Sequence, residues 1–242
     1  MTNKMTSDSE TSRRDFLKTS SSAAVASAAT LGLISRGSAY GQNSDTIRVG
    51  LVGCGGRGTG AASQALTADE NIKLTAVADV FPGRVESTVN GLKKRHEKKV
   101  DVPHQFVGLD AYQKLIDSGV DLVVLAGFMR LLTPEFIGTF RHHILNIHPA
   151  LLPNFPGAHA HRDALAAGVN ESGCSAHLVD EGVDTGPIIL QQSVEVLPGD
   201  TEEILAARIL PHEHRLLPEA VRLLAAGRLK VDGGIVRILP EK

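Results

Sequence analysis

The stretch IRVGLVGCGGRGTGA occupies residues 47–61 and decides the fold. It opens with an apolar run typical of a buried strand, places glycines at 53, 55 and 58 in a turn, and continues as a helical segment. Glycine lets the backbone approach a phosphate group, and the first turn of a helix offers free N–H groups. The stretch therefore predicts the first strand, turn and helix of an α/β domain.

Apolar runs and helical segments alternate beyond this stretch. We expect strands at 47–53, 72–79, 104–108, 120–127, 143–148, 174–180 and 187–196, helices at 59–68, 84–99, 110–119 and 134–140, and a hairpin at 229–239. A long helix should begin at Asp200, which has capping-box spacing with Glu203, and kink or divide at Pro211 and Pro218. The pattern predicts an α/β fold in which helices cover both faces of a mostly parallel sheet.

Composition excludes several classes of partner. The chain has 242 residues and a net charge of −2, which fits one soluble globular domain acting on small molecules. Tryptophan is absent and aromatic residues are few, so base-stacking platforms for nucleic acid are not expected. The basic run KKRHEKK at 93–99 is interpreted as the solvated end of a helix.

The first 44 residues differ from the rest of the chain. SRRDFLK at 12–18 resembles the twin-arginine export signal, and the Ser/Ala-rich run after it is too short and too weakly apolar to span a membrane. We expect residues 1–44 to be a disordered leader for the twin-arginine translocase, and residues 45–242 to form a single domain. The alternative is a tail with a chance pair of arginines. A functional leader would send the folded protein to the periplasm.

Cysteine and histidine spacing gives no metal motif. Cys54 and Cys174 lie far apart, and their spacing neither indicates nor excludes a disulfide. A zinc site around His159 and His161 would need carboxylate or cysteine ligands nearby, so no metal is expected.

The N-terminal half resembles a family of oxidoreductases. Residues 13–126, including IRVGLVGCGGRGTGA and AVADVFPGR, are similar to the exported branch of the glucose–fructose oxidoreductase and inositol dehydrogenase family. Asp79 ends the second strand, where the dinucleotide fingerprint has an acidic residue. The Glu-Lys-Pro motif and the substrate domain of that family are absent. This resemblance implies, as an alternative function, a module that binds NAD(P) without turnover.

The C-terminal half resembles the phosphoribosylglycinamide formyltransferase family. The matching segments are AGFMRLLTPEF (126–136), ILNIHPALLPNFPGAHAHRDALAAG (144–168), HLVDEGVDTGPIILQ (177–191) and EHRLLPEAVRLLAAGRL (213–229). The two resemblances, 45–126 and 120–242, meet in the strand VDLVVLA, as in a chimera of two Rossmann-like proteins. The second implies formyl transfer from the co-substrate 10-formyltetrahydrofolate to glycinamide ribonucleotide; an inactive chimera is the other alternative.

Formyl transfer to an amine passes through a tetrahedral intermediate, which needs a group to stabilise an oxyanion and a path for a proton. Asn146 and His148 alternate along a strand, so their side chains leave the same face. The resemblance implies that His148 stabilises the oxyanion and Asn146 orients the formyl oxygen. Asp184 would face His148, favour its charged form and organise the water that moves the proton.

The resemblance also implies two binding regions. The folate pocket comprises Met129, Arg130, Leu131, Leu132, Val179, Asp180, Glu181, Gly182 and Val183. The ribonucleotide would contact Gly55, Gly56, Arg57, Gly58, Thr59 and Glu213. Glu213 matches a residue that contacts the ribose, whereas the glycine turn replaces the family's Ser-Gly-Asn-Gly-Ser-Asn turn. His159, His161 and His177 are expected to order loops and pack.

The two ends of the chain imply different compartments. Formyl transfer in purine biosynthesis implies the cytoplasm, whereas the expected leader implies export to the periplasm.

Overall fold

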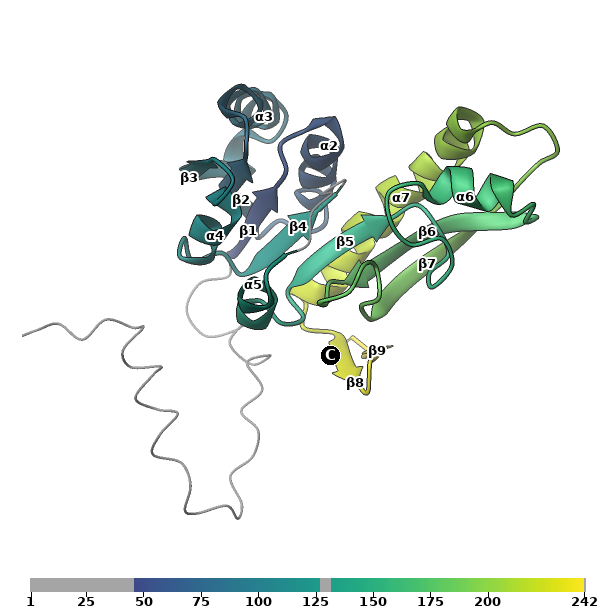
Figure 1. Ribbon diagram of the computed structural model, residues 1–242. Coiled ribbons are helices and arrows are strands. Elements are labelled where there is room, and N and C mark those ends of the chain that lie inside the picture. Colours follow the sequence, from purple (N-terminus) through teal and green to yellow (C-terminus); the bar gives the residue numbers. More distant parts are fainter. Residues whose placement is uncertain (1–45, 127–131, 242) are drawn as a thin grey trace, which may run out of the picture. The chain divides into compact units, whose positions relative to one another are not determined.

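The computed structural model describes residues 46–126 and 132–241. The expected leader and the expected folate-binding residues Met129, Arg130 and Leu131 lie outside the described residues. Within the described part, a seven-stranded sheet has the order β3-β2-β1-β4-β5-β6-β7 (Figure 1). Strands β1 to β5 are parallel, and β6 is antiparallel to both of its neighbours, β5 and β7. The predicted mostly parallel α/β fold is confirmed.

The elements follow one another in regular alternation through the first half of the sheet. The strands are β1 (Ile47–Val52), β2 (Ile72–Asp79), β3 (Val100–Val107), β4 (Leu122–Leu125), β5 (Ile144–His148), β6 (Glu171–Leu178), β7 (Ile188–Glu195), β8 (Leu229–Asp232) and β9 (Ile235–Ile238). The helices are α2 (Gly56–Ala65), α3 (Pro82–Arg95), α4 (Ala111–Ile116), α5 (Pro134–Thr139), α6 (Ala160–Ala166) and α7 (Glu202–Ala225), with a 3-10 turn η2 (Glu97–Lys99). The pair β8–β9 forms the predicted terminal hairpin.

Two apolar clusters cover opposite faces of the sheet because side chains alternate along each strand. In β4, Leu122 and Val124 pack with α2, α3 and α7, whereas Val123 and Leu125 pack with α4 and α5. A strand buried on both faces reads as a continuous apolar run, as LVVL does. Helices therefore cover both faces, and the carboxyl ends of the central strands stay accessible for a site.

The glycine turn between β1 and α2 depends on two positions. Gly53 has a φ of 95°, in the region that favours glycine. A Cβ on Gly58 would lie 1.8 Å from the carbonyl oxygen of Gly53, so only glycine lets α2 pack this closely on the strand. Asp79 completes the turn: its carboxylate accepts hydrogen bonds from the backbone N–H groups of Cys54, at 2.7 Å, and Phe81, at 2.9 Å.

Helix α7 differs from its prediction. Its N-cap is Thr201, whose hydroxyl accepts from the backbone N–H of Ile204 at 3.4 Å, while Asp200 instead pairs with Arg208. Pro211 and Pro218 both lie inside one helix, so the expected division into two helices is wrong, and the other expected outcome, a kink, stays a prediction. A buried stripe on α7 packs against β6, β7 and α2, and this tertiary packing outweighs the hydrogen bonds that the prolines remove.

Other differences concern boundaries and one missed element. Strand β3 begins at Val100 rather than at residue 104, and α2 begins at Gly56 rather than at residue 59. Helix α6 was not predicted, because its sequence AHRDALA has no extended apolar period. Cys54 and Cys174 are buried free thiols. No helix in the described ranges is long and apolar enough to cross a bilayer.

Candidate active site

The site is built where β5 ends beside β6. Asn146 and His148 are both on β5, and the antiparallel register sets them opposite His177 and Ser175 of β6. With Asp184, from the loop between β6 and β7, Asn146, His148 and His177 line a cavity of about 760 Å³. The structure thus brings the three residues of the expected catalytic set into one cavity.

Asp184 is the centre of the polar cluster. Its Oδ2 lies 3.3 Å from Nδ1 of His148 and accepts from the backbone N–H of Gly157 at 2.8 Å. Its Oδ1 lies 3.5 Å from Nε2 of His177 and 3.4 Å from the amide nitrogen of Asn146. Burial alone would raise the pKa of Asp184. The bonds from His177 and Gly157, with the charges of the two histidines, outweigh burial and lower the pKa below 3.8.

His148 has an acceptor beside each ring nitrogen. Its Nε2 donates to the backbone carbonyl of Phe155 at 2.8 Å, and its Nδ1 faces the carboxylate of Asp184. The residue is only 4% exposed, so water does not replace these partners. An imidazolium, which donates from both nitrogens, satisfies the whole arrangement. The carbonyl of Phe155 and the carboxylate of Asp184 therefore fix the orientation of the His148 ring at the cavity.

Asn146 is oriented by neighbours within the cluster. Its amide nitrogen lies 3.1 Å from Nε2 of His177 and 3.4 Å from Oδ1 of Asp184. His177 donates from Nδ1 to the carbonyl of Leu178 at 2.9 Å, and its Nε2 lies between the amide of Asn146 and the carboxylate of Asp184. The amide group of Asn146 is thus held by His177 and Asp184 before any substrate arrives.

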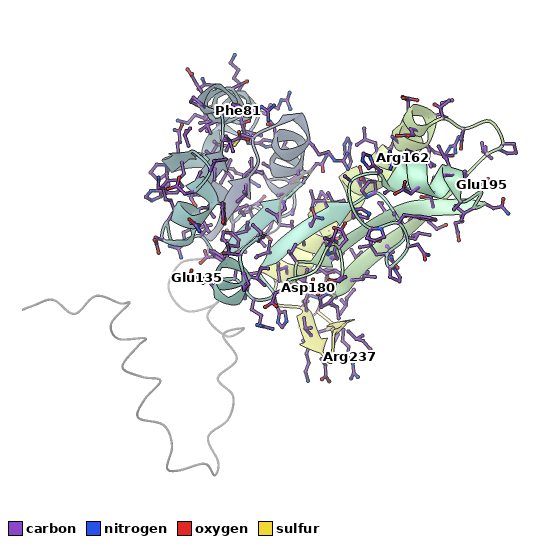
Figure 2. The ribbon with its side chains drawn as sticks, in the orientation of Figure 1. Phe81, Glu135, Arg162, Asp180, Glu195 and Arg237 are labelled. Carbon is purple, nitrogen blue, oxygen red and sulfur yellow. The ribbon has the colours of Figure 1, made fainter. Side chains whose placement is uncertain are left out.

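The loop that carries Asp184 is held in a tight conformation. Asp180 accepts at Oδ1 from the backbone N–H of Gly182, at 3.0 Å, and from the hydroxyl of Thr185, at 2.6 Å. Asp184 has a φ of 53°, which is uncommon for a residue with a side chain. A Cβ on Gly186 would lie 1.9 Å from the carbonyl of Leu178. Figure 2 labels Asp180 in this loop, which follows β6.

A second loop, residues 149–159, is anchored by polar side chains of β6 and β7. The hydroxyl of Ser175 donates to the carbonyl of Ala150 at 2.6 Å and accepts from the backbone N–H of Leu152 at 3.1 Å. Gln191 donates to the carbonyl of Leu152 at 2.9 Å and to Ser175 at 2.8 Å. These bonds fix the loop whose carbonyl at Phe155 and N–H at Gly157 contact His148 and Asp184.

The described part of the expected folate region lines the same cavity. These residues are Leu132, Val179, Asp180, Glu181, Gly182 and Val183. The loop offers backbone groups and the half-exposed side chain of Val183. A flat ligand with polar edges could therefore contact both the loop and the apolar wall.

The expected ribonucleotide residues divide into two groups. Arg57 and Glu213 line the main cavity and form an ion pair, and Gly56 lines a second cavity with both of them. Gly55, Gly58 and Thr59 line neither of these two cavities. The hydroxyl of Thr59 bonds to that of Thr88 at 2.7 Å, inside the protein.

Sequence reasoning missed two histidines that line the cavity. His161 and His177 were expected only to order loops and pack, yet both face the cavity. Burial lowers the pKa of His161, and the charge of Arg57 adds to this, although Glu213 opposes it. The β5–β6 register, which the sequence does not reveal, places His177 beside Asn146. Within the described ranges, no group of three or more His, Cys, Asp or Glu is placed to hold a metal.

Comparison with known proteins identifies a family and several similar proteins. A family model described as formyl transferase matches residues 88–221, which is more than half of the chain and begins inside α3. Phosphoribosylglycinamide formyltransferase of Mycobacterium tuberculosis (strain ATCC 25618 / H37Rv) is 57% identical over 113 residues, covering 47% of this chain and 53% of that protein. The trifunctional purine biosynthetic protein adenosine-3 of Drosophila pseudoobscura pseudoobscura is 54% identical over 122 residues, 50% of this chain and 9% of that protein.

A solved structure extends the similarity over the fold. The crystal structure of glycinamide ribonucleotide transformylase 1 from Symbiobacterium toebii superposes with a TM-score of 0.70 and 39% identity, covering 82% of this chain and 96% of that one. The chain spans about half the length, or less, of the two curated relatives above. From the family match and this structural similarity, we conclude that the chain belongs to the formyl transferase family.

Proposed function

We propose that this protein transfers the formyl group of 10-formyltetrahydrofolate to the amine of glycinamide ribonucleotide. The observation that carries the proposal is the convergence of Asn146, His148 and Asp184 on one cavity in a chain of the formyl transferase family. The names of the relatives from Mycobacterium tuberculosis and Symbiobacterium toebii support this choice of amine.

The proposed reaction uses the three side chains in separate roles. The amine nitrogen attacks the formyl carbon, and the oxygen becomes an oxyanion that His148 stabilises and Asn146 orients. The bond between the formyl carbon and N10 of the folate then breaks. The proton lost by the amine reaches N10 through water organised by Asp184, whose neighbours keep its pKa low despite burial, so that the carboxylate is ionised at neutral pH.

The folate is proposed to lie against Leu132 and the loop Val179–Val183. The resemblance adds Met129, Arg130 and Leu131 to the folate-binding residues, and these three lie outside the described residues. This placement is supported because residues 179–183 line the cavity and are followed directly in the sequence by Asp184. The ribonucleotide is proposed to enter at the end of the cavity formed by Arg57 and Glu213.

A steady-state assay tests the proposed function. The full chain is mixed with 10-formyltetrahydrofolate and glycinamide ribonucleotide, and formation of the formylated product is followed by chromatography. We expect turnover that falls by about a hundredfold or more in His148→Ala, as for other acid–base groups. His104→Ala on β3, an exposed histidine outside the cavity, is the matched control and should retain the parental rate.

The N-terminal segments carry a second part of the proposal. The resemblance of SRRDFLK to export signals supports a twin-arginine leader over residues 1–44, followed by a single domain whose residues 45–126 are oxidoreductase-like. The leader favours the periplasm, whereas the proposed substrates favour the cytoplasm. Cell fractionation of the full chain, with a double-lysine variant of Arg13 and Arg14 as control, distinguishes the two compartments.

The alternative of an NAD(P)-binding module makes a different prediction. The glycine turn and Asp79 support it, as the residues that the dinucleotide fingerprint requires. Calorimetry with NAD and with a folate analogue separates the two functions: binding of NAD alone would favour the module. Absence of a cooperative melt would favour the inactive chimera.

A further inference from the structure

An ion pair joins the glycine turn to the longest helix. Arg57, in the first turn of α2, donates from its guanidinium to the carboxylate of Glu213 in the middle of α7. The side chain of Glu213 is only 4% exposed, whereas that of Arg57 is 39% exposed. The buried carboxylate therefore depends on a partner that itself reaches solvent, and that partner can leave more easily than the carboxylate can.

The pair stands between two cavities. The main cavity of about 760 Å³ and a second one of about 290 Å³ have only four lining residues in common within the described part of the chain, namely Arg57, Ile147, Leu210 and Glu213. Gly56, Gly60 and Ala61 of α2 line the second cavity. Separation of Arg57 from Glu213 would leave the carboxylate, which lines both cavities, open to a ligand.

A ligand that separates this pair must offer an anionic group to Arg57 and hydrogen-bond donors to Glu213. Ribose hydroxyls can donate to Glu213, but a neutral ribose has no anion for Arg57, so it has to break the ion pair without replacing it. A phosphate monoester accepts the guanidinium in a bidentate, charge-assisted contact. Arg57 is the only Lys or Arg among the described residues that line the two cavities.

We propose that Arg57 is a specificity-determining residue that latches Glu213 and makes ribose binding conditional on a phosphate. A phosphorylated ribose draws Arg57 onto its phosphate and leaves Glu213 free for its hydroxyls. An unphosphorylated riboside meets a carboxylate that is already occupied. This inference rests on the proposed function, because glycinamide ribonucleotide is the phosphorylated ribose concerned.

Calorimetry on the full chain tests the latch without turnover. The dissociation constants of glycinamide ribonucleotide and of its dephosphorylated riboside are measured for the parent, Arg57→Gln and Arg57→Lys. We expect Arg57→Gln to bind the riboside more tightly and the ribonucleotide less tightly than the parent. The preference for the phosphate should fall by about tenfold or more, the scale of one charge-assisted contact, with Arg57→Lys intermediate.

Two further variants provide an independent test and a control. Glu213→Gln weakens the ion pair from the other side and keeps an acceptor for ribose, so it should bind the riboside more tightly than the parent does, and it gives this readout even if Arg57→Gln does not fold. Arg215→Gln makes the same charge change on an exposed residue of α7 that lines neither cavity, and should bind like the parent.

The latch is overturned if Arg57→Gln changes the affinities for the two compounds by the same factor, or if Glu213→Gln binds the riboside no more tightly than the parent. It is also overturned if the parent binds neither compound. In that last case a folate analogue separates the hypotheses: its binding would leave the formyl-donor half of the proposed function standing, and its failure would remove both.

Discussion

His177 lies directly opposite Asn146 across β5 and β6, and its Nε2 lies 3.1 Å from the amide nitrogen of Asn146. Because His177 fixes the amide, we expect His177→Ala to lower kcat by about fivefold, the scale of one hydrogen bond, with KM for the folate unchanged. His177→Gln, whose amide can still form a hydrogen bond with Asn146 or Asp184, should recover part of the loss. Steady-state kinetics of both variants check this, and an equal loss in both would contradict it.

Asp184→Asn keeps the shape of the site and removes its negative charge. The rate should fall by on the order of a hundredfold, while binding of a folate analogue changes little. Addition of His148→Ala should cost little more than the worse single change, because groups that act as one unit are not additive. Kinetics of the two single variants and the double variant measure this. Fully additive losses would show that the residues act independently.

Burial lowers the pKa of His161 below 6.5, with a contribution from Arg57 that Glu213 opposes. The folded chain then binds fewer protons than the unfolded chain, so the contribution to stability is complete above the unfolded pKa and is lost as pH falls through it. We expect Tm to drop between about pH 7.5 and about pH 5.5, and to drop less in His161→Gln. The corresponding change at exposed His104 is the control. An unchanged pH dependence in His161→Gln would refute this assignment.

Two glycines in α2 should respond oppositely to alanine. A Cβ at Gly58 would lie 1.8 Å from a carbonyl oxygen, so Gly58→Ala should lose about 2 kcal/mol or more of unfolding free energy. Gly60 has no atom within 4 Å of an added Cβ, and Gly60→Ala should gain up to about 1 kcal/mol from helix propensity. Urea denaturation measures both. A neutral Gly58→Ala would mean that α2 can move away from β1 at little cost.

Removal of residues 1–44 should leave the thermal transition of the chain unchanged. That segment has no apolar periodicity with which to pack on the domain. Calorimetric melts of the full and shortened chains provide the comparison. A markedly lower Tm after removal would show that the leader contributes to the fold.

The fold was largely predictable because its central strands and glycine turn are local signals. LVVL reads as a strand buried on both faces, and Gly53 and Gly58 stand where the close turn requires them. Helix α7 shows where local rules failed: Pro211 and Pro218 argue for a break, but packing along its buried face keeps one helix.

The candidate site was predictable only in part. Alternation along β5 correctly placed Asn146 and His148 on one face, and both line the cavity with Asp184. The neighbours set by β5–β6 pairing and by the fold of α7 onto α2 could not be read from spacing. His177 joins the cluster through register, and Arg57 meets Glu213 across more than half of the chain.

The left-handed backbone at Asp184 is offset by the bonds of its own side chain. With a φ of 53°, this residue holds a conformation that glycine adopts at no cost. Asp184→Gly would relax the turn, but it would leave the N–H of Gly157 and the buried ring of His148 without their carboxylate. Directed evolution for heat resistance alone should therefore keep aspartate here, because the strained residue is also the acceptor that holds its neighbours.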